Sequence, residues 1–172
     1  MNRLLTLLML FFMGCSVTTM TSNYDESADF SSYKTFSYQN YEESSKPAHP
    51  EYNNLANREI IQQAITNELL SVGYIAVAEN PDLLVAFDMI ITEKVDPRVD
   101  SAVIYKPWVD TKIDSFSYAE GLLVVRLIDR KEGNMVWQGS LSGILNRRPE
   151  KFGHKIGHYI AKLFATLTEH MQ

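Results

Sequence analysis

The sequence predicts an α+β fold, with one largely antiparallel β-sheet and two helices packed on one of its faces. Residues 120–145 alternate apolar and polar side chains on both sides of a short break, which is typical of a β-hairpin. Residues 55–72 and 150–169 instead repeat apolar side chains every three or four positions, as amphipathic helices do. The expected order of elements is strand, helix, four strands and helix.

The hairpin of residues 120–145 is the expected centre of the sheet. Gly133 lies at its break, where a short loop needs a residue that tolerates positive φ. Gly139 falls on the same face as Trp137, so a helix could pack close to the backbone there. The alternation also places on one face the apolar residues Leu123, Val125, Leu127, Trp137, Leu141 and Leu145.

Upstream of the hairpin, an aromatic and alternating segment at residues 33–38 predicts the first strand. The helix of residues 55–72 follows a loop, with Asn54 as its N-cap and Gly73 at its end. Its apolar stripe consists of Ile61, Ala64, Ile65, Leu69 and Val72.

Two further strands are expected between this helix and the hairpin. Residues 74–78 predict a short strand, and residues 83–92 a longer one whose continuous apolar run indicates that both faces are covered. Residues 94–119 are the least regular part of the chain. The buried face expected for the last helix consists of Phe152, Ile156, Tyr159, Ile160, Leu163 and Leu167.

Length and composition suit one globular domain with short additional segments, because the 172 residues are 45% hydrophobic and 22% charged. The formal net charge of −5 and the absence of basic stripes argue against a nucleic-acid partner. The chain has one cysteine, which excludes an intrachain disulfide and a cysteine metal cluster. No cofactor is expected.

The N-terminal residues predict a lipid anchor. A short basic start and an apolar run lead to Gly14-Cys15, an arrangement that resembles a bacterial lipoprotein signal and its lipobox. We expect residues 1–14 to be the signal peptide, Cys15 to be lipidated, residues 15–29 to be a flexible tether and residues 30–172 to be a single domain. The alternative is an ordinary secretory signal with a chance cysteine. Ser16, rather than Asp, suggests by resemblance to enterobacterial sorting an outer-membrane protein facing the periplasm.

Candidate chemical sites are incomplete. His154 and His158 lie four residues apart on the last helix, but no carboxylate or cysteine completes a metal-ligand set. The aspartates of residues 96–114 lack the spacing of a calcium loop. Arg147, Arg148, Lys151 and Lys155 form a basic cluster that is expected to be solvated, the alternative being contact with anionic headgroups or an acidic partner. No metal site is predicted, and without a catalytic motif no enzyme activity is predicted.

An aromatic group is the best candidate for a contact with a partner. Tyr105, Trp108 and Tyr118 suit recognition, because aromatic side chains dominate the energy of many interfaces. They could equally close the open edge of the core. Residues 94–119 therefore predict either a contact surface for an envelope partner or a twisted extension of the neighbouring strands.

Three segments, in this order and spacing, resemble the bacterial lipoprotein family called domain of unknown function 4136. They are YDESADFSSYKTFSY (Tyr24–Tyr38), GYIAVAENPDLLVAF (Gly73–Phe87) and EGLLVVRLIDRKEGNMVWQG (Glu120–Gly139). The resemblance implies an envelope lipoprotein of α+β fold with no assigned reaction, and it supplies no catalytic residues. We therefore expect a lipid-anchored, non-catalytic interaction or structural domain. The alternatives are a small-ligand-binding lipoprotein and, after it, a hydrolase.

Overall fold

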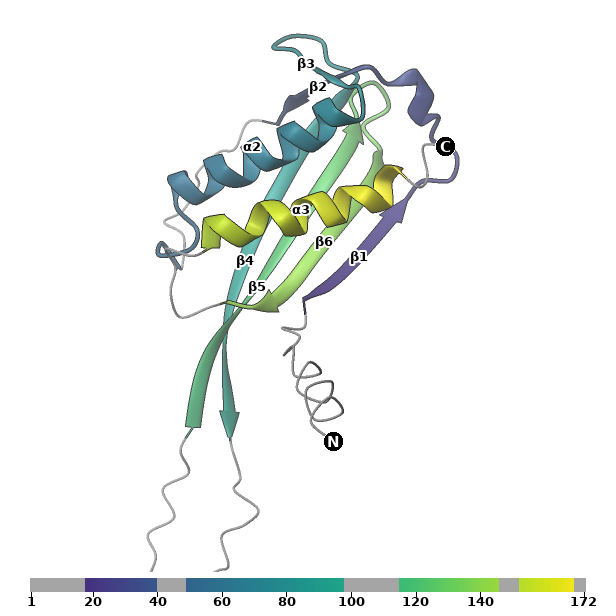
Figure 1. Ribbon diagram of the computed structural model, residues 1–172. Coiled ribbons are helices and arrows are strands. Elements are labelled where there is room, and N and C mark those ends of the chain that lie inside the picture. Colours follow the sequence, from purple (N-terminus) through teal and green to yellow (C-terminus); the bar gives the residue numbers. More distant parts are fainter. Residues whose placement is uncertain (1–17, 40–48, 98–114, 146–151, 169–172) are drawn as a thin grey trace, which may run out of the picture.

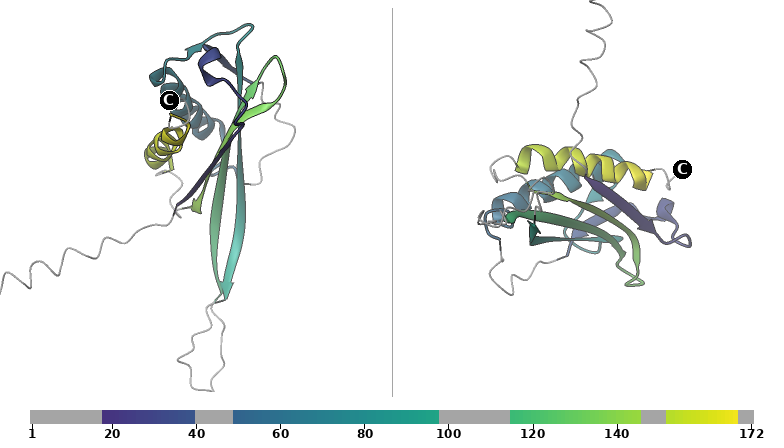
Figure 2. Two further views of the ribbon diagram at one scale, coloured as in Figure 1. Left: turned by 90° about the vertical axis from the view of Figure 1, so that its right-hand side faces the viewer. Right: turned by 90° about the horizontal axis from the view of Figure 1, so that it is seen from below.

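The computed structural model describes residues 18–39, 49–97, 115–145 and 152–168. Its elements form two layers, a six-stranded sheet and a pair of helices that cover one face of that sheet (Figures 1 and 2). The strands are β1 (Thr19–Tyr24), β2 (Thr35–Tyr38), β3 (Ile75–Ala76), β4 (Leu83–Pro97), β5 (Ser115–Asp129) and β6 (Met135–Ile144). The helices are α2 (Leu55–Ser71) and α3 (Phe152–Thr168), with a 3-10 turn, η2, at Phe30–Ser32.

The strand order is β1-β6-β5-β4-β2-β3. Pairing is antiparallel from β1 through β6 and β5 to β4, whereas β2 pairs in parallel with both β4 and β3. The α+β class is thus confirmed, but the prediction of a largely antiparallel sheet is wrong, because the sheet is mixed. The parallel pairs follow from α2, which carries the chain from the end of β2 back to the start of β3.

Strand β1 corrects the predicted order of elements and the predicted tether. We expected a flexible segment over residues 15–29, but Thr19–Tyr24 pairs with β6 along the whole of its length. Met20 packs against the core from this strand, and the backbone N–H of Asp25 continues the pairing by donating to the carbonyl of Val136 at 2.9 Å. The ordered domain therefore begins before residue 30.

Helix α2 matches its prediction closely. The side-chain oxygen of Asn54 accepts a hydrogen bond from the backbone N–H of Asn57 at 2.9 Å, which caps the first turn. Gly73 follows the helix with φ at +96°, the left-handed conformation that ends many helices. The predicted stripe faces the sheet, and Ile61, Ile65 and Leu69 are fully buried.

The hairpin and α3 form the centre of the core. Trp137 is fully buried, and its ring centroid lies 5.1 Å from that of Phe164 on α3. Gly133 has φ at +73° in the turn, as expected. The predicted face of α3 is buried at Ile156, Ile160, Leu163 and Leu167, with Phe152 and Tyr159 packed at its margin. Phe164, which the prediction omitted, is also buried because it packs on Trp137.

The two faces of the sheet differ in their cover. Both helices lie on the same side, and no other described helix lies on the opposite side (Figure 2). The sequence suggested that both faces of β4 are covered. The structure shows that this prediction is wrong, because the described helices cover only one face. Leu83 and Val85 are fully buried under the helices, whereas Ile90 on the opposite face is 53% exposed. We call this opposite side the open face.

Candidate interaction surface

Strand register defines which residues form the open face. On the two central strands, Leu84 pairs with Ile128 and Ile90 pairs with Leu122, so these four apolar side chains share the face. Towards β1, the same face becomes polar, with Thr21 opposite Ser140 and a hydrogen bond of 2.6 Å between their hydroxyls. The open face thus mixes apolar side chains with polar ones, because Asp88 and Arg126 lie between the two apolar pairs. A surface of this mixed composition is suited to contact with another molecule.

Two ion pairs cross the open face between β4 and β5. Asp88 pairs with Arg126, and Lys94 pairs with Glu120. Each pair runs diagonally, because the register places Asp88 opposite Val124 and Lys94 opposite Tyr118. The hydrogen bond from Lys94 to Glu120 raises the pKa of Lys94, so the ammonium group stays charged on this face.

Arg126 is the most constrained charged side chain of the open face. Its guanidinium reaches Asp88 through one terminal nitrogen, while its Nε is buried and has no hydrogen-bond partner among the described residues. A buried N–H without an acceptor is costly, so the pair with Asp88 is the polar contact that holds this side chain in place.

Beyond the sheet, β4 and β5 continue as a two-stranded arm, which we define as Lys94–Pro97 with Ser115–Tyr118. The last strand pair between β5 and β6 is Glu120 with Ile144, and one further hydrogen bond joins the backbone N–H of Leu145 to the carbonyl of Ala119. The arm residues pair only with each other among the described strands. Figure 1 shows the arm projecting past the ends of β6 and β1.

The arm carries one of the three aromatic residues proposed as a partner contact. Tyr118 is partly buried on the open face, opposite Lys94. Tyr105 and Trp108 lie outside the described residues, as does Cys15. Whether the three aromatic residues lie close together therefore stays a prediction. Residues 94–119 were predicted to form either a contact surface or an extension of the neighbouring strands. The extension is found at both ends of the segment, at residues 94–97 and 115–119.

The predicted polar clusters take ordinary surface positions where they are described. His158 is exposed on α3 with its ring centroid 5.9 Å from that of Tyr159, and the side chain of His154 lies outside the described set. Lys155 is exposed, while Arg147, Arg148 and Lys151 fall in undescribed residues. In the part of the chain that the structure describes, no three His, Cys, Asp or Glu side chains gather as metal ligands.

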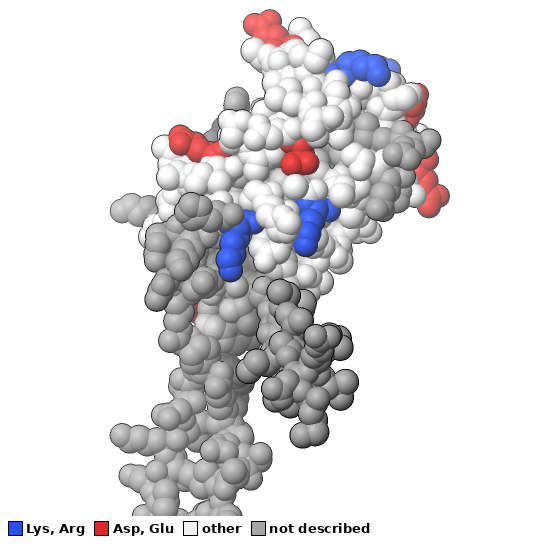
Figure 3. Space-filling model, viewed as in Figure 1, with Lys and Arg blue, Asp and Glu red and all other residues white. Residues whose placement is uncertain are grey.

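Seen from the helix side, charged side chains are few and scattered over the described surface (Figure 3). Among the described residues on that face, Lys and Arg side chains do not gather into a basic patch of the kind that binds nucleic acid. Neither described helix has the length and apolar character that a membrane crossing requires.

A polar network at the end of the sheet opposite the arm has a structural role. Asp82 Oδ2 accepts hydrogen bonds from the backbone N–H groups of Lys34 and Thr35, both at 2.9 Å, and from Thr35 Oγ1 at 2.8 Å. These bonds, with that from Lys34 as the largest cause, lower the pKa of Asp82. The carboxylate therefore fixes β2 against the start of β4.

Asp129 has the same kind of environment at the β5–β6 turn. Its carboxylate accepts hydrogen bonds from the backbone N–H groups of Lys131 and Glu132 at 2.7 and 2.9 Å, and from Tyr33 Oη at 2.9 Å. The backbone donor of Glu132 is the largest cause that lowers the pKa of Asp129. Burial, followed by this hydrogen bond, raises the pKa of Tyr33 to about 12, so its hydroxyl remains a donor. This geometry leaves the pair suited to holding a turn rather than to acid–base catalysis.

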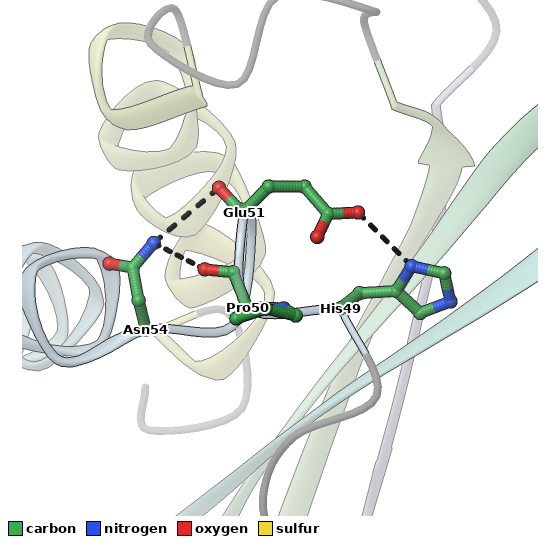
Figure 4. A network of polar contacts seen from close by, with 4 residues as sticks. All are labelled: His49, Pro50, Glu51 and Asn54. Atoms are coloured by element: carbon green, nitrogen blue, oxygen red, sulfur yellow. Dashed lines mark hydrogen bonds and ion pairs between the residues drawn. The ribbon is translucent and has the colours of Figure 1, made fainter.

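The segment before α2 holds a third network, drawn in Figure 4. His49 Nδ1 lies 3.1 Å from Glu51 Oε1, and Asn54 Nδ2 donates to the carbonyls of Pro50 and Glu51 at 2.9 and 3.4 Å. All these bonds span five residues or fewer, so the network shapes the entry into α2. It brings together no groups from distant parts of the chain.

The residues that the sequence did not single out are those of the open face, above all Arg126, Asp88 and Lys94. A usable signal was present, because alternation in the β4 segment puts Leu84, Asp88 and Ile90 on one side of the strand. What the sequence did not reveal is that this side is left without a helix.

The fold and this surface define an α+β protein with a mixed sheet, one helix-covered face and one open face. The chain belongs to the family described as "Domain of unknown function (DUF4136)", whose model matches residues 20–167. The resemblance seen in the sequence is thereby confirmed. The matched region begins within β1, in agreement with an ordered domain that starts before residue 30.

A solved structure shows the same fold at low sequence identity. A PDZ domain protein from Parabacteroides distasonis is similar over 94% of this chain and 40% of its own, with 16% identity and a TM-score of 0.53. The chain thus spans less than half the length of that protein. A PelC dodecamer from Paraburkholderia phytofirmans is similar over 87% of this chain and 96% of its own, with 13% identity and a TM-score of 0.48. No curated protein matches the sequence.

Proposed function

We propose that the protein is a lipid-anchored domain of the bacterial envelope that acts by binding an envelope partner and not by catalysis. Cys15 carries the lipid, and the domain faces the periplasm from the outer membrane. The open face, together with Tyr105, Trp108 and Tyr118, provides the contact. The observation that carries the proposal is the short distance in sequence between Gly14-Cys15 and β1, which begins at Thr19.

The arrangement of the elements supports this proposal. A lipid on Cys15 would be joined almost directly to a paired strand, so the domain would be held close to the bilayer. Several acyl chains together anchor a protein firmly, at about 0.8 kcal/mol for each buried methylene. The carboxylates of Asp82 and Asp129 favour a structural role, because each accepts backbone hydrogen bonds that hold the ends of strands.

The anchor is tested by Cys15→Ser, which removes the thiol that would carry the lipid. We expect the variant to leave the membrane fraction and its N-terminal peptide to lack the acyl mass found on the unchanged chain. Ser16→Ala is the matched control, since it alters the next residue and keeps the thiol. Membrane retention of Cys15→Ser, with no lipid mass on the unchanged chain, would refute the proposal.

Sorting is tested at the neighbouring position. Ser16→Asp places at that position the residue associated with retention in the inner membrane, so we expect the variant to move from the outer to the inner membrane fraction. The Ser16→Ala control should remain in the outer membrane. Equal distribution of the two variants would contradict the outer-membrane assignment while leaving the lipid anchor intact.

A further inference from the structure

We propose that the β4–β5 arm rests on the bilayer that holds the Cys15 lipid, so that the membrane surface itself is the partner of the arm. This inference rests on the proposed lipid anchor and adds a second, protein-mediated contact to it. It follows from three geometric relationships and from the chemistry of the described arm residues.

The first relationship is direction. Strands β1, β6, β5 and β4 are successively antiparallel, so the start of β1 and the end of β4 lie at the same end of the sheet. Figure 1 shows the first residue of β1 and the projecting arm at this common end. A chain that enters β1 from a bilayer therefore enters from the side towards which the arm points.

The second relationship is reach. Thr19 is level with Ile90 of β4, through the pairs Thr19–Ser142, Ser142–Leu122 and Leu122–Ile90. The seven residues from Ile90 to Pro97 extend about 23 Å along the strand direction. The four residues from Thr19 back to Cys15 span at most about 14 Å, even when fully extended. The arm thus extends further beyond the level of Thr19 than the lipidated residue does.

The third relationship excludes the opposite orientation. If the arm pointed away from the bilayer, β1 would run from Thr19 towards the bilayer. The five residues from Thr19 to Tyr24 would then advance about 17 Å in that direction. This length exceeds the reach of about 14 Å that joins Thr19 to Cys15. The anchored domain is therefore left with its arm pushed against the bilayer or lying along its surface.

The described arm residues suit the interfacial zone. Val95 is 63% exposed, and Tyr118 is a partly buried aromatic residue with a hydroxyl group, a type enriched where membranes meet water. The ammonium group of Lys94 is paired with Glu120, and its methylene stem can cover apolar surface. With Glu93 and Asp96 near it in the sequence and Glu120 paired with it, Lys94 does not make the arm basic, so the contact depends on the position of the arm and not on attraction to an anionic lipid surface.

The test measures the contact of single positions with lipid in the full, lipidated chain. Val95→Cys is labelled with a fluorophore in vesicles of phosphatidylethanolamine and phosphatidylglycerol that contain a nitroxide-bearing phospholipid. Ile75→Cys is the matched control, because Ile75 is an aliphatic strand residue of similar exposure, 60%, at the opposite end of the sheet. We expect the nitroxide lipid to quench the label at position 95 and to leave the label at position 75 unchanged.

A second variant tests the geometry. A ten-residue Gly/Ser spacer inserted between Thr18 and Thr19 keeps Cys15 intact and adds roughly 17 Å of average reach. The quenching at position 95 should then fall towards that at position 75. Raising the fraction of phosphatidylglycerol at a constant fraction of nitroxide lipid should leave the quenching unchanged.

The outcomes separate the two proposals. The unchanged chain should not react with the thiol-directed fluorophore, because its one cysteine is in a thioether; a labelled Cys15 would refute the lipid anchor. Equal quenching at positions 95 and 75, with Cys15 unreactive, would overturn the arm contact alone. Quenching at position 95 that the spacer does not reduce would overturn the geometric argument.

Discussion

Gly139 of β6 lies against Leu163 of α3 so closely that a Cβ at position 139 would come within 2.8 Å of Leu163 Cγ. The same atom would meet the ring of Trp137 at 2.5 Å. Since real Cβ atoms do not approach other atoms so closely, only glycine lets the helix pack here without movement. The sequence pattern had indicated this close approach, and the structure identifies the side chains that require it.

Gly139→Ala should therefore destabilise the protein. Inserting a methyl group into a packed contact costs about 1–3 kcal/mol, because Leu163 and Trp137 must both shift. Denaturant unfolding measures the change. Ser142→Ala is the control, since Ser142 lies on the open face of the same strand and its change should be within about 0.5 kcal/mol. Similar losses in the two variants would contradict the assigned packing.

Trp137 allows the cost of lost volume to be compared with the cost of an unpaired buried donor. Its side chain is fully buried, and its indole N–H has no acceptor among the described residues. Trp137→Ala should cost about 3–5 kcal/mol because it leaves a cavity under α3. Trp137→Phe should cost clearly less, since it keeps most of the ring and removes the unpaired donor. Equal costs in denaturant melts would mean that the indole N–H has a partner.

Acid should weaken the bond between β2 and the start of β4 through Asp82. Because folding lowers the pKa of this carboxyl below its usual 3.8, the stabilisation is present above that value and is lost as pH falls through the lower, folded pKa. Asp82→Asn should cost about 1–2 kcal/mol at pH 7 and progressively less below about pH 4. Thermal melts of both proteins across this range should converge. A pH-independent difference between them would argue that charge has no part in the effect.

The extent of β1 predicts where the domain can be shortened. A chain that starts at Thr18 keeps all six strand pairs with β6, whereas one that starts at Ser22 loses three of them and the packed side chain of Met20. The shorter chain should melt several degrees lower, because a loss of about 1 kcal/mol lowers the melting temperature by roughly 2–4 °C for 150–250 residues. Equal melting temperatures would indicate that β1 adds no stability.

Trp108 tests the partner contact that the sequence predicts. If it anchors an envelope partner, Trp108→Ala should abolish a crosslink formed in intact cells and change the melting temperature little. If it covers the core, stability should fall and the crosslink should weaken only in proportion. The crosslink and the melting temperature of Tyr118→Ala are compared with those of Trp108→Ala, because Tyr118 is the proposed contact residue that lies in the described arm. Full stability with every crosslink retained would remove Trp108 from the proposed contact.

The sequence predicted most elements because their periodicity reflects burial on one face. Both helices and the β5–β6 hairpin follow from this periodicity, as does the N-cap at Asn54. Strand β1 was missed because it is an edge strand held mainly by backbone pairing with β6 and has few apolar side chains, so Thr19–Tyr24 looks like a linker. The parallel pairing of β2 was missed although its cause, a helix between two strands, was visible.

The open face was beyond prediction for a different reason. An apolar run such as that of β4 is compatible with cover on one face or on both, and only the placement of the helices decides between them. Arg126 and Asp88 likewise gave no signal as a pair, because they meet only through the register of two strands. The candidate surface is a property of tertiary arrangement.

The pairing of β1 with β6 also has a consequence for the order of events during synthesis. Thr19 pairs with Ser142, which is made 123 residues later, so β1 has no partner strand until nearly the whole domain has been made. An apolar strand left alone for that time is prone to aggregate. The sequence of β1, Thr-Met-Thr-Ser-Asn-Tyr, has only two large apolar side chains. Its polarity keeps the earliest strand of the domain soluble until the last strand is complete.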